Sequence, residues 1–295
     1  MSKSKSGFVL IGAGGYIAPR HMKAIYETGN KIVVAVDPSD SVGILDMYGH
    51  DIEYFSQESE LVDWFRDNPG TARYTSVCSP NYLHSAHVEI GLRAGTDVIC
   101  EKPLVIDGFE IDWLKQVEES TGNRVWVVLQ LRYHPLIIAL KKRLKKSGTH
   151  NVKLRYITPR GKWYQSSWKG CEEKGGGLCT NIGIHFFDML IWLFGPVKNW
   201  CTTINLGTTV AGRLALDRAE VEWFLSVDGD NLPEGITDPV RSLQIDDEYI
   251  EFSKGFTNLH TSVYQGVLNQ KGHGIGDAEP SIRLVSEIRS KAING

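Results

Sequence analysis

The sequence predicts an α/β protein in two parts: a parallel sheet covered by helices, then a second α/β domain with a largely antiparallel open sheet. Between residues 7 and 129, short apolar runs alternate with helical patterns, whereas after about residue 150 strand-like stretches follow one another directly. The chain has 295 residues, of which 42% are hydrophobic and 23% charged. This length and balance are typical of a globular protein with one large domain or two ordinary ones.

Strands and helices alternate in the first part. The apolar runs are nearly continuous, which is typical of strands buried on both faces of a parallel sheet. Helical patterns separate them at residues 61–66, 85–94 and 109–120. The expected strands cover residues 8–11, 32–36, 74–78, 97–100 and 125–129.

The second part reads as a succession of strands interrupted by one strong helix. That helix covers residues 181–194 and ends at Gly195-Pro196, a pair that stops helices. Two further helices are expected at 260–269 and 280–292, and a bridging helix at 132–146. We therefore expect one boundary, with domains at residues 1–125 and 126–295. The expected strands cover residues 152–158, 197–205, 210–217, 220–227, 241–245 and 248–252.

Charge and cysteine content exclude several classes of protein. The net charge of −3 gives no electrostatic footprint for nucleic acid or an anionic membrane, and the basic run at 141–146 reads as a solvated helix face. The five cysteines form no Cys-x-x-Cys pair, which fits reduced thiols in the cytoplasm. The first seven residues form a short polar stretch, unlike a secretory signal. No run approaches the ~20 apolar residues of a membrane span. We expect a cytoplasmic enzyme with soluble substrates.

A glycine-rich loop at residues 12–18 follows the first strand and opens a helix. In that context Gly12 permits a tight turn, Gly14 lets the backbone approach a pyrophosphate, and Ala18 allows close packing of helix on strand. The pyrophosphate would bind at the helix N-terminus. The alternative is a plain turn with glycines for geometry. Asp37 directly follows the second strand. A carboxylate there can bind the ribose hydroxyls and would repel a 2′-phosphate, so NAD is favoured over NADP.

Two residues are candidates for the chemistry. Lys102 follows the strand at 97–100, where ligands bind in open α/β sheets, and its ammonium can stabilise a developing alkoxide. Its alternative is a surface lysine before a turn; the Lys102–Pro103 bond can be cis or trans. His185 lies one helical turn after Asn181 and suits proton transfer near neutral pH. Its alternative is a core or capping histidine. Asp188 would give a His-x-x-Asp pair, but no further ligands support a metal site.

Five motifs in this order resemble the Gfo/Idh/MocA family of oxidoreductases. The resemblance implies a Rossmann domain followed by an α/β domain, and it assigns the catalytic roles to Lys102 and His185. The family often has Asp where this chain has Asn181, which moves the role of base towards His185. The motifs are the glycine loop, Ser79-Pro80-Asn81-Tyr82-Leu83-His84, Glu101-Lys102-Pro103, Gln130-Leu131-Arg132-Tyr133-His134-Pro135, and Gly175-Gly176-Gly177 through Asp188.

Three stretches, at residues 160–170, 181–188 and 255–261, resemble more closely the WlbA/WbpB group of UDP-N-acetylglucosaminuronate (UDP-GlcNAcA) 3-dehydrogenases. That resemblance implies oxidation of the sugar C3 hydroxyl in bacterial surface-polysaccharide (O-antigen) biosynthesis. It further implies a tightly held NAD recycled by 2-oxoglutarate, a downstream aminotransferase and a homotetramer. Cations at Arg160, Lys162 and Lys169 suit a substrate with phosphates and a carboxylate. The plainer reading of this loop is a basic surface with buried aromatics.

The sequence therefore predicts two sets of binding residues around Lys102 and His185. Other substrates of the same family, a different sugar or a cyclitol, remain open, as does a non-catalytic NAD-binding regulator, against which Lys102 and His185 argue. The expected substrate-binding residues are Lys102, Arg160, Lys162, Trp163, Tyr164, Trp168, Asn181 and His185. The expected NAD-binding residues are Gly12, Gly14, Gly15, Tyr16, Ile17, Asp37, Ser79, Asn81, His84, Glu101, Lys102 and Gln130.

Overall fold

The computed structural model describes residues 6–144, 148–251 and 258–293, which form two compact units. The first unit contains residues 6–129 and 258–278, and the second contains the other described residues. The single division expected after residue 125 did not anticipate that residues 258–278 return to the first unit. Of the sequence features singled out above, residues 255–257 and the lysines at 145 and 146 lie outside the described residues.

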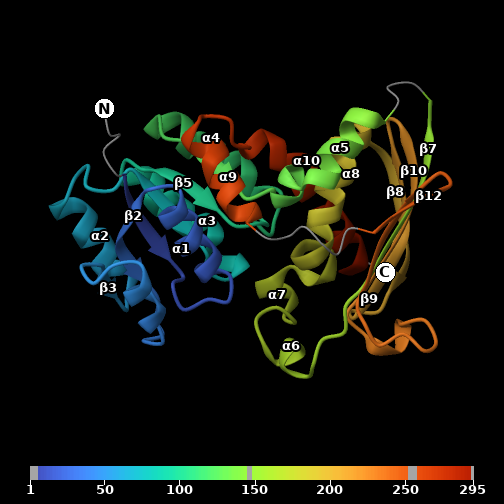
Figure 1. Ribbon diagram of the computed structural model, residues 1–295, viewed down its shortest axis with the longest axis horizontal. Helices are drawn as coiled ribbons and strands as arrows, with labels where there is room; N and C mark the ends of the chain where they lie inside the picture. The colour runs from blue at the N-terminus through green and yellow to red at the C-terminus, as the bar shows by residue number, and fades with distance from the viewer. Residues whose placement is uncertain (1–5, 145–147, 252–257, 294–295) are drawn as a thin grey trace. The chain divides into compact units, whose positions relative to one another are not determined.

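The first unit is built on a six-stranded sheet in which every pair of neighbouring strands is parallel (Figure 1). The order is β3-β2-β1-β4-β5-β6. Strands β1, β4, β5 and β6 are buried along their whole length, as expected for strands of a parallel sheet covered on both faces. This confirms the predicted Rossmann architecture. The strands are β1 (Gly7–Ile11), β2 (Lys31–Val36), β3 (Glu53–Phe55), β4 (Tyr74–Val77), β5 (Asp97–Cys100) and β6 (Val125–Val127).

Helices of the first unit include one contributed from late in the chain. Helix α9 (Leu259–Leu268) lies beside α1 (Ala18–Glu27) (Figure 1). Two hydrogen bonds join them: Lys23 Nζ donates to Asn258 Oδ1 at 2.7 Å, and Thr261 Oγ1 donates to Glu27 Oε2 at 2.7 Å. The remaining helical elements, in which η1 and η2 are short 3-10 helices, are η1 (Gly43–Met47), α2 (Glu58–Asp67), η2 (Asn81–Leu83), α3 (His84–Arg93), α4 (Glu110–Thr121) and the start of α10 (Ile275–Ile293).

The second unit is built on a mixed six-stranded sheet of order β12-β11-β7-β10-β9-β8. Only the β7–β10 pair is parallel, so the prediction of a largely antiparallel sheet is confirmed. Burial alternates along β7 and β10, as expected for strands with one covered face. The strands are β7 (His150–Ile157), β8 (Val197–Asn205), β9 (Thr209–Leu216), β10 (Ala219–Ser226), β11 (Val240–Ile245) and β12 (Glu248–Glu251).

The predicted strong helix is α8 (Ile184–Phe194), which follows directly on a π-helical turn, η4 (Cys179–Gly183). Among the described residues, only the stretch Glu172–Phe194 is long and apolar enough to cross a membrane, which the sequence analysis did not expect. Its most apolar window is 78% buried inside the fold, as in the core helix of a globular domain. The other helical elements are η3 (Gln130–Tyr133), α5 (Pro135–Arg143), α6 (Trp163–Ser166), α7 (Glu172–Gly175) and η5 (Gly229–Asn231).

Candidate active site

The glycine loop is shaped by close backbone contacts. Gly12 has φ +86°, and a Cβ there would lie 2.5 Å from the backbone nitrogen of Ser79. A Cβ on Gly14 would lie 3.1 Å from Asp37 Oδ1. Glycine is therefore required at Gly12 by both backbone conformation and space, whereas at Gly14 a side chain would crowd the Asp37 carboxylate.

The Asp37 carboxylate is held beside this loop at the end of β2. Oδ2 accepts the Gly14 N–H at 2.9 Å, and Oδ1 accepts the Ser39 N–H at 2.8 Å. Each oxygen keeps a lone pair with which to accept a ribose hydroxyl. Within the described residues, the backbone amides of Tyr16 and Ile17 donate to no protein acceptor, so they can bind an anion at the start of α1. These features fit a dinucleotide such as NAD.

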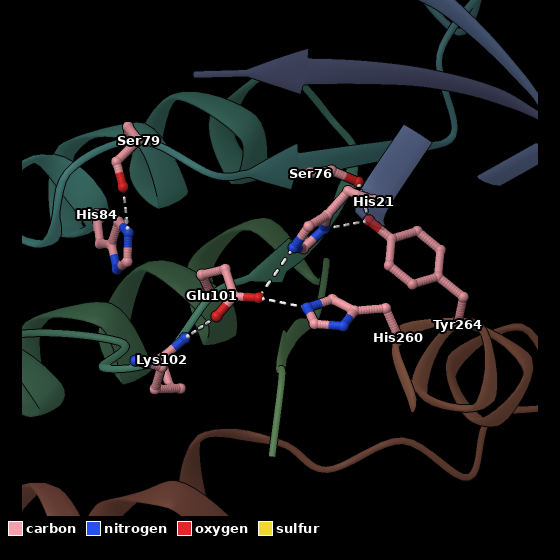
Figure 2. A network of polar contacts seen from close by, with 8 residues as sticks. All are labelled: His21, Ser76, Ser79, His84, Glu101, Lys102, His260 and Tyr264. Carbon is pink, nitrogen blue, oxygen red and sulfur yellow. Dashed lines mark hydrogen bonds and ion pairs between the residues drawn. The ribbon is translucent and has the colours of Figure 1, made fainter. Parts of the chain in front are cut away.

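His84 links the loop after β4 to the Glu101-Lys102-Pro103 motif. Its Nε2 lies 2.8 Å from the carbonyl oxygen of Ser79 (Figure 2). Its Nδ1 lies 2.6 Å from the carbonyl oxygen of Pro103. The imidazole is only 1% exposed. Burial lowers the pKa of His84, although both carbonyl acceptors favour the protonated ring. The predicted cofactor residue Asn81 is also buried, in η2 beside this link.

Glu101 and Lys102 follow β5, and the Lys102–Pro103 bond is cis. Glu101 is 5% exposed, and its Oε1 accepts hydrogen bonds from His21 Nε2 at 3.0 Å and His260 Nε2 at 2.8 Å (Figure 2). Burial alone raises the pKa of the Glu101 carboxyl, but these hydrogen bonds outweigh it and hold the pKa well below its usual range. Glu101 is therefore ionised at neutral pH.

Sequence reasoning missed both histidines as functional candidates. His260 lies in the 255–261 stretch, which is one of the three that resemble the WlbA/WbpB group. Nothing in that stretch indicates a contact with Glu101. Together with Glu101 the two imidazoles are the only group of possible metal ligands of this kind among the described residues, with their donor atoms within 4.8 Å of one another. The N···O separations of 2.8 and 3.0 Å are those of hydrogen bonds. The expectation of no metal stays a prediction.

The second unit carries His185 near the start of α8, where its side chain is partly exposed. Asn181 lies in the preceding π-helical turn, so the two residues do not keep the regular α-helical spacing that the sequence suggested. Asn181 Nδ2 donates to the Tyr164 hydroxyl at 3.0 Å. Asp188 is bound by Arg132 through two hydrogen bonds of 2.7 and 3.0 Å. Asp188 is therefore part of a buried ion pair, three residues after the partly exposed His185.

The loop after β7 brings cations and aromatic rings together. Lys169 Nζ lies 4.2 Å from the centre of the Trp168 ring, and its pKa is lowered by burial and by the positive charge of Arg160. Burial raises the pKa of Tyr164, while its contact with Asn181 and the charge of Arg160 lower it. The rings of Trp163 and Tyr164 meet edge to face at 5.8 Å. Arg160, Trp163 and the predicted Lys162 are exposed, whereas Tyr164 is buried.

Two glycines in this region are needed for the loop to close. A Cβ on Gly170 would lie 2.6 Å from the backbone of residues 164 and 165, and Gly176, which ends α7, has φ +79°. These glycines bring the polypeptide back from the cationic loop to η4 and α8. Gln130, expected to contact the cofactor, begins η3 at the start of the second unit.

Comparison with known proteins identifies the family. Residues 6–129 match the oxidoreductase family, NAD-binding Rossmann fold, and residues 148–211 match the oxidoreductase family, C-terminal alpha/beta domain, both of Gfo/Idh/MocA. The WlbA (WbpB) dehydrogenase from Thermus thermophilus, in complex with NAD and alpha-ketoglutarate, is 44% identical, with a TM-score of 0.94 over 97% of this chain and 95% of that chain. The structure of the same dehydrogenase in complex with NAD and UDP-GlcNAcA is also 44% identical, with a TM-score of 0.92 over 96% of this chain and 94% of that chain.

Curated relatives match over shorter stretches. A putative UDP-kanosamine synthase oxidoreductase subunit of Amycolatopsis mediterranei is 35% identical over 41% of this chain and 34% of its own length. Inositol 2-dehydrogenase of Rhizobium meliloti is 26% identical over 68% of this chain and 58% of its own length. The chain thus spans less than two thirds of either curated relative. Both domains and the 44% identity establish that the chain belongs to the Gfo/Idh/MocA family of NAD-binding oxidoreductases.

Proposed function

We propose that the protein oxidises the C3 hydroxyl of UDP-GlcNAcA to a 3-keto sugar with NAD. The observation that carries the proposal is the 44% identity, over 96% of the chain, to a WlbA dehydrogenase bound to NAD and UDP-GlcNAcA. We place the reaction in the cytoplasm, in bacterial surface-polysaccharide (O-antigen) biosynthesis, and expect a homotetramer. A downstream aminotransferase would consume the keto sugar.

The loop at 160–170 has the chemistry that this substrate requires. A diphosphate and a uronate carry negative charge, and Arg160 and Lys169 lie close enough for the charge of one to shift the pKa of the other. Guanidinium groups bind phosphate and carboxylate through two parallel hydrogen bonds. The faces of Trp163 and Trp168 suit the uracil base or the sugar ring. Lys162 adds a third cation at the exposed side of the loop.

His185 and Lys102 divide the chemistry between them in this proposal. Bound NAD supplies the acceptor for the hydride that leaves C3. His185 takes the proton of the C3 hydroxyl, because Asn181 cannot accept a proton and Asp188 is committed to Arg132. Lys102 stabilises the negative charge that develops on the C3 oxygen. The Thermus thermophilus dehydrogenase bound to alpha-ketoglutarate supports 2-oxoglutarate as the compound that regenerates the oxidised cofactor.

The test uses the purified protein with UDP-GlcNAcA and 2-oxoglutarate and no added cofactor. We expect a 3-keto sugar and 2-hydroxyglutarate in equal amounts, because a retained cofactor would be reduced and reoxidised in turn. Failure to form the 3-keto sugar, even with NAD added, would refute the substrate assignment. A cyclitol substrate is the second candidate, since the inositol 2-dehydrogenase aligns over 68% of the chain, and myo-inositol is assayed in parallel.

Two variants test the assigned roles. His185→Ala should lower kcat by about a hundredfold or more while NAD stays bound. His50→Ala, at an exposed histidine, is the control. Arg160→Ala should chiefly raise the KM for UDP-GlcNAcA, with the exposed Arg155→Ala as its control. An unchanged kcat in the first variant, or an unchanged KM in the second, would remove that residue from the site.

A further inference from the structure

The buried carboxylate of Glu101 is bound by two imidazoles from distant parts of the chain. His21 lies on α1, 80 residues before Glu101, and His260 lies on α9, 159 residues after it. Both Nε2 atoms contact the same oxygen, Oε1, and the two rings pack edge to face with centres 5.0 Å apart. A buried carboxylate usually pairs with Lys or Arg, whereas this one is bound by two histidines.

The protons of this network follow from its contacts. Burial lowers the pKa of His21, so its ring is neutral near pH 7 and carries one N–H. That N–H lies on Nε2, since the ionised Glu101 only accepts. The bare Nδ1 then accepts the Tyr264 O–H at 2.7 Å, and the Tyr264 oxygen accepts the Ser76 O–H at 2.7 Å (Figure 2). Ser76 on β4 therefore donates to Tyr264, Tyr264 donates to His21, and His21 donates to Glu101.

The other carboxylate oxygen reaches the proposed catalytic residue. Glu101 Oε2 accepts the backbone N–H of Lys102 at 3.1 Å (Figure 2). Two donors on Oε1 fix the plane of the carboxylate, and that plane sets the position of Oε2. The peptide that carries the Lys102 side chain is thus tied, through one carboxylate, to helices α1 and α9.

We propose that His260 and His21 are positioning residues, which hold the Glu101 carboxylate and, through it, the peptide of Lys102 in place for the reaction. Its kinetic consequence rests on the function proposed above, because it assumes that Lys102 acts in catalysis. Its structural consequence does not, since the hydrogen bond from the Lys102 amide exists whatever the substrate.

The structural consequence is tested by hydrogen exchange of the Lys102 amide, resolved by mass spectrometry with electron-transfer fragmentation. His260→Leu removes one donor and should speed exchange of this amide about tenfold, with the amides of β5 unchanged. His260→Gln, which restores an N–H donor, should return exchange to within about threefold of the wild type. Thr261→Ala removes the adjacent bond to Glu27 without touching Glu101 and should leave the Lys102 amide unchanged.

The kinetic consequence is a fall in kcat without a change in KM. His260→Leu should lower kcat with UDP-GlcNAcA about tenfold at an unchanged KM, and His260→Gln should restore most of it. Should His260→Leu fail to fold, His21→Leu, which removes the other donor to Glu101, is measured in the same way with the same expectation. A wild-type protein inactive on this substrate, with the exchange effect intact, would refute the proposed function and leave the positioning role standing.

Three outcomes would overturn the proposal. The first is an unchanged Lys102 amide in folded His260→Leu. The second is equal acceleration in Thr261→Ala, which would show general loosening of α9. The third is one tightly bound divalent ion per chain in the purified protein that is lost in His260→Leu, since the histidines would then be metal ligands.

Discussion

The ion pair between Arg132 and Asp188 offers a quantitative test of how the second unit holds the helix that carries His185. Its hydrogen bonds are 2.7 and 3.0 Å long, and the side chains are 5% and 4% exposed. Asp188 lies one turn after His185 on α8. Removing one partner of a buried ion pair costs about 3–5 kcal/mol. Arg132→Met and Asp188→Leu should each lower the free energy of unfolding by that amount.

The double variant separates the ion pair from its surroundings. With both charges replaced by apolar groups, no charge is left uncompensated, so the loss should be well below the sum of the single losses, with a coupling of about 2 kcal/mol or more. Urea unfolding followed by near-UV circular dichroism measures all three variants, and kcat should fall in both single variants. A loss under about 1 kcal/mol in either single variant would refute the reasoning.

Three further outcomes follow from the first unit. Gly12→Ala places a Cβ 2.5 Å from backbone and should abolish NAD retention, whereas Gly29→Ala, which has φ +82° but nothing within 4 Å, should keep it; both are measured by cofactor content. Asp37→Ala removes the acceptor of the Gly14 amide and should weaken the affinity for NAD about tenfold, so that the ratio of NAD affinity to NADP affinity falls. Titration calorimetry measures both affinities, and unchanged values would contradict this role of Asp37. Because the pKa of His21 is lowered in the folded state, the unfolded chain takes up a proton on this ring at a higher pH than the folded chain does. The contribution of neutral His21 to the free energy of unfolding is therefore complete above pH 6.5 and is lost as the pH falls below that value. His21→Gln should flatten the dependence of the urea midpoint between pH 7.5 and 5.5, and an unchanged slope would exclude this cause.

Both sheets could be predicted from the order of apolar and helical segments. The parallel strands are nearly continuous apolar runs separated by helical patterns, whereas the strands of the second set follow one another with turn residues between them. Strand β3 was not expected, because it has only three residues and none is buried. The helix at Leu259–Leu268 was expected, but an apolar helix face does not say which sheet it covers. The π-helical turn before α8 also has no periodic signal of its own.

The candidate site was predictable where function depends on local sequence. The glycine loop and Asp37 each follow a strand directly, so the sequence indicated both as cofactor residues, and the structure adds the hydrogen bond of 2.9 Å between Gly14 and Asp37. The partners of Glu101 were not predictable, because they lie 80 and 159 residues away and no local pattern announces a buried hydrogen bond. The sequence showed Asp188 only as part of a His-x-x-Asp pair with His185, because its pairing with Arg132 again depends on a contact distant in sequence, 56 residues away.

The return of residues 258–278 to the first unit has a consequence for synthesis on the ribosome. The strands of the Rossmann sheet emerge first, but helix α9 emerges only after the whole mixed sheet has been translated. Until then the nascent chain holds the Glu101 carboxylate without the imidazole of His260 and without the hydroxyl of Tyr264. Domains usually complete folding in order from the N-terminus. Here the nucleotide-binding domain is completed only after the second sheet has been made, so truncated chains that stop before α9 would carry a Rossmann sheet in which Glu101 lacks the His260 donor.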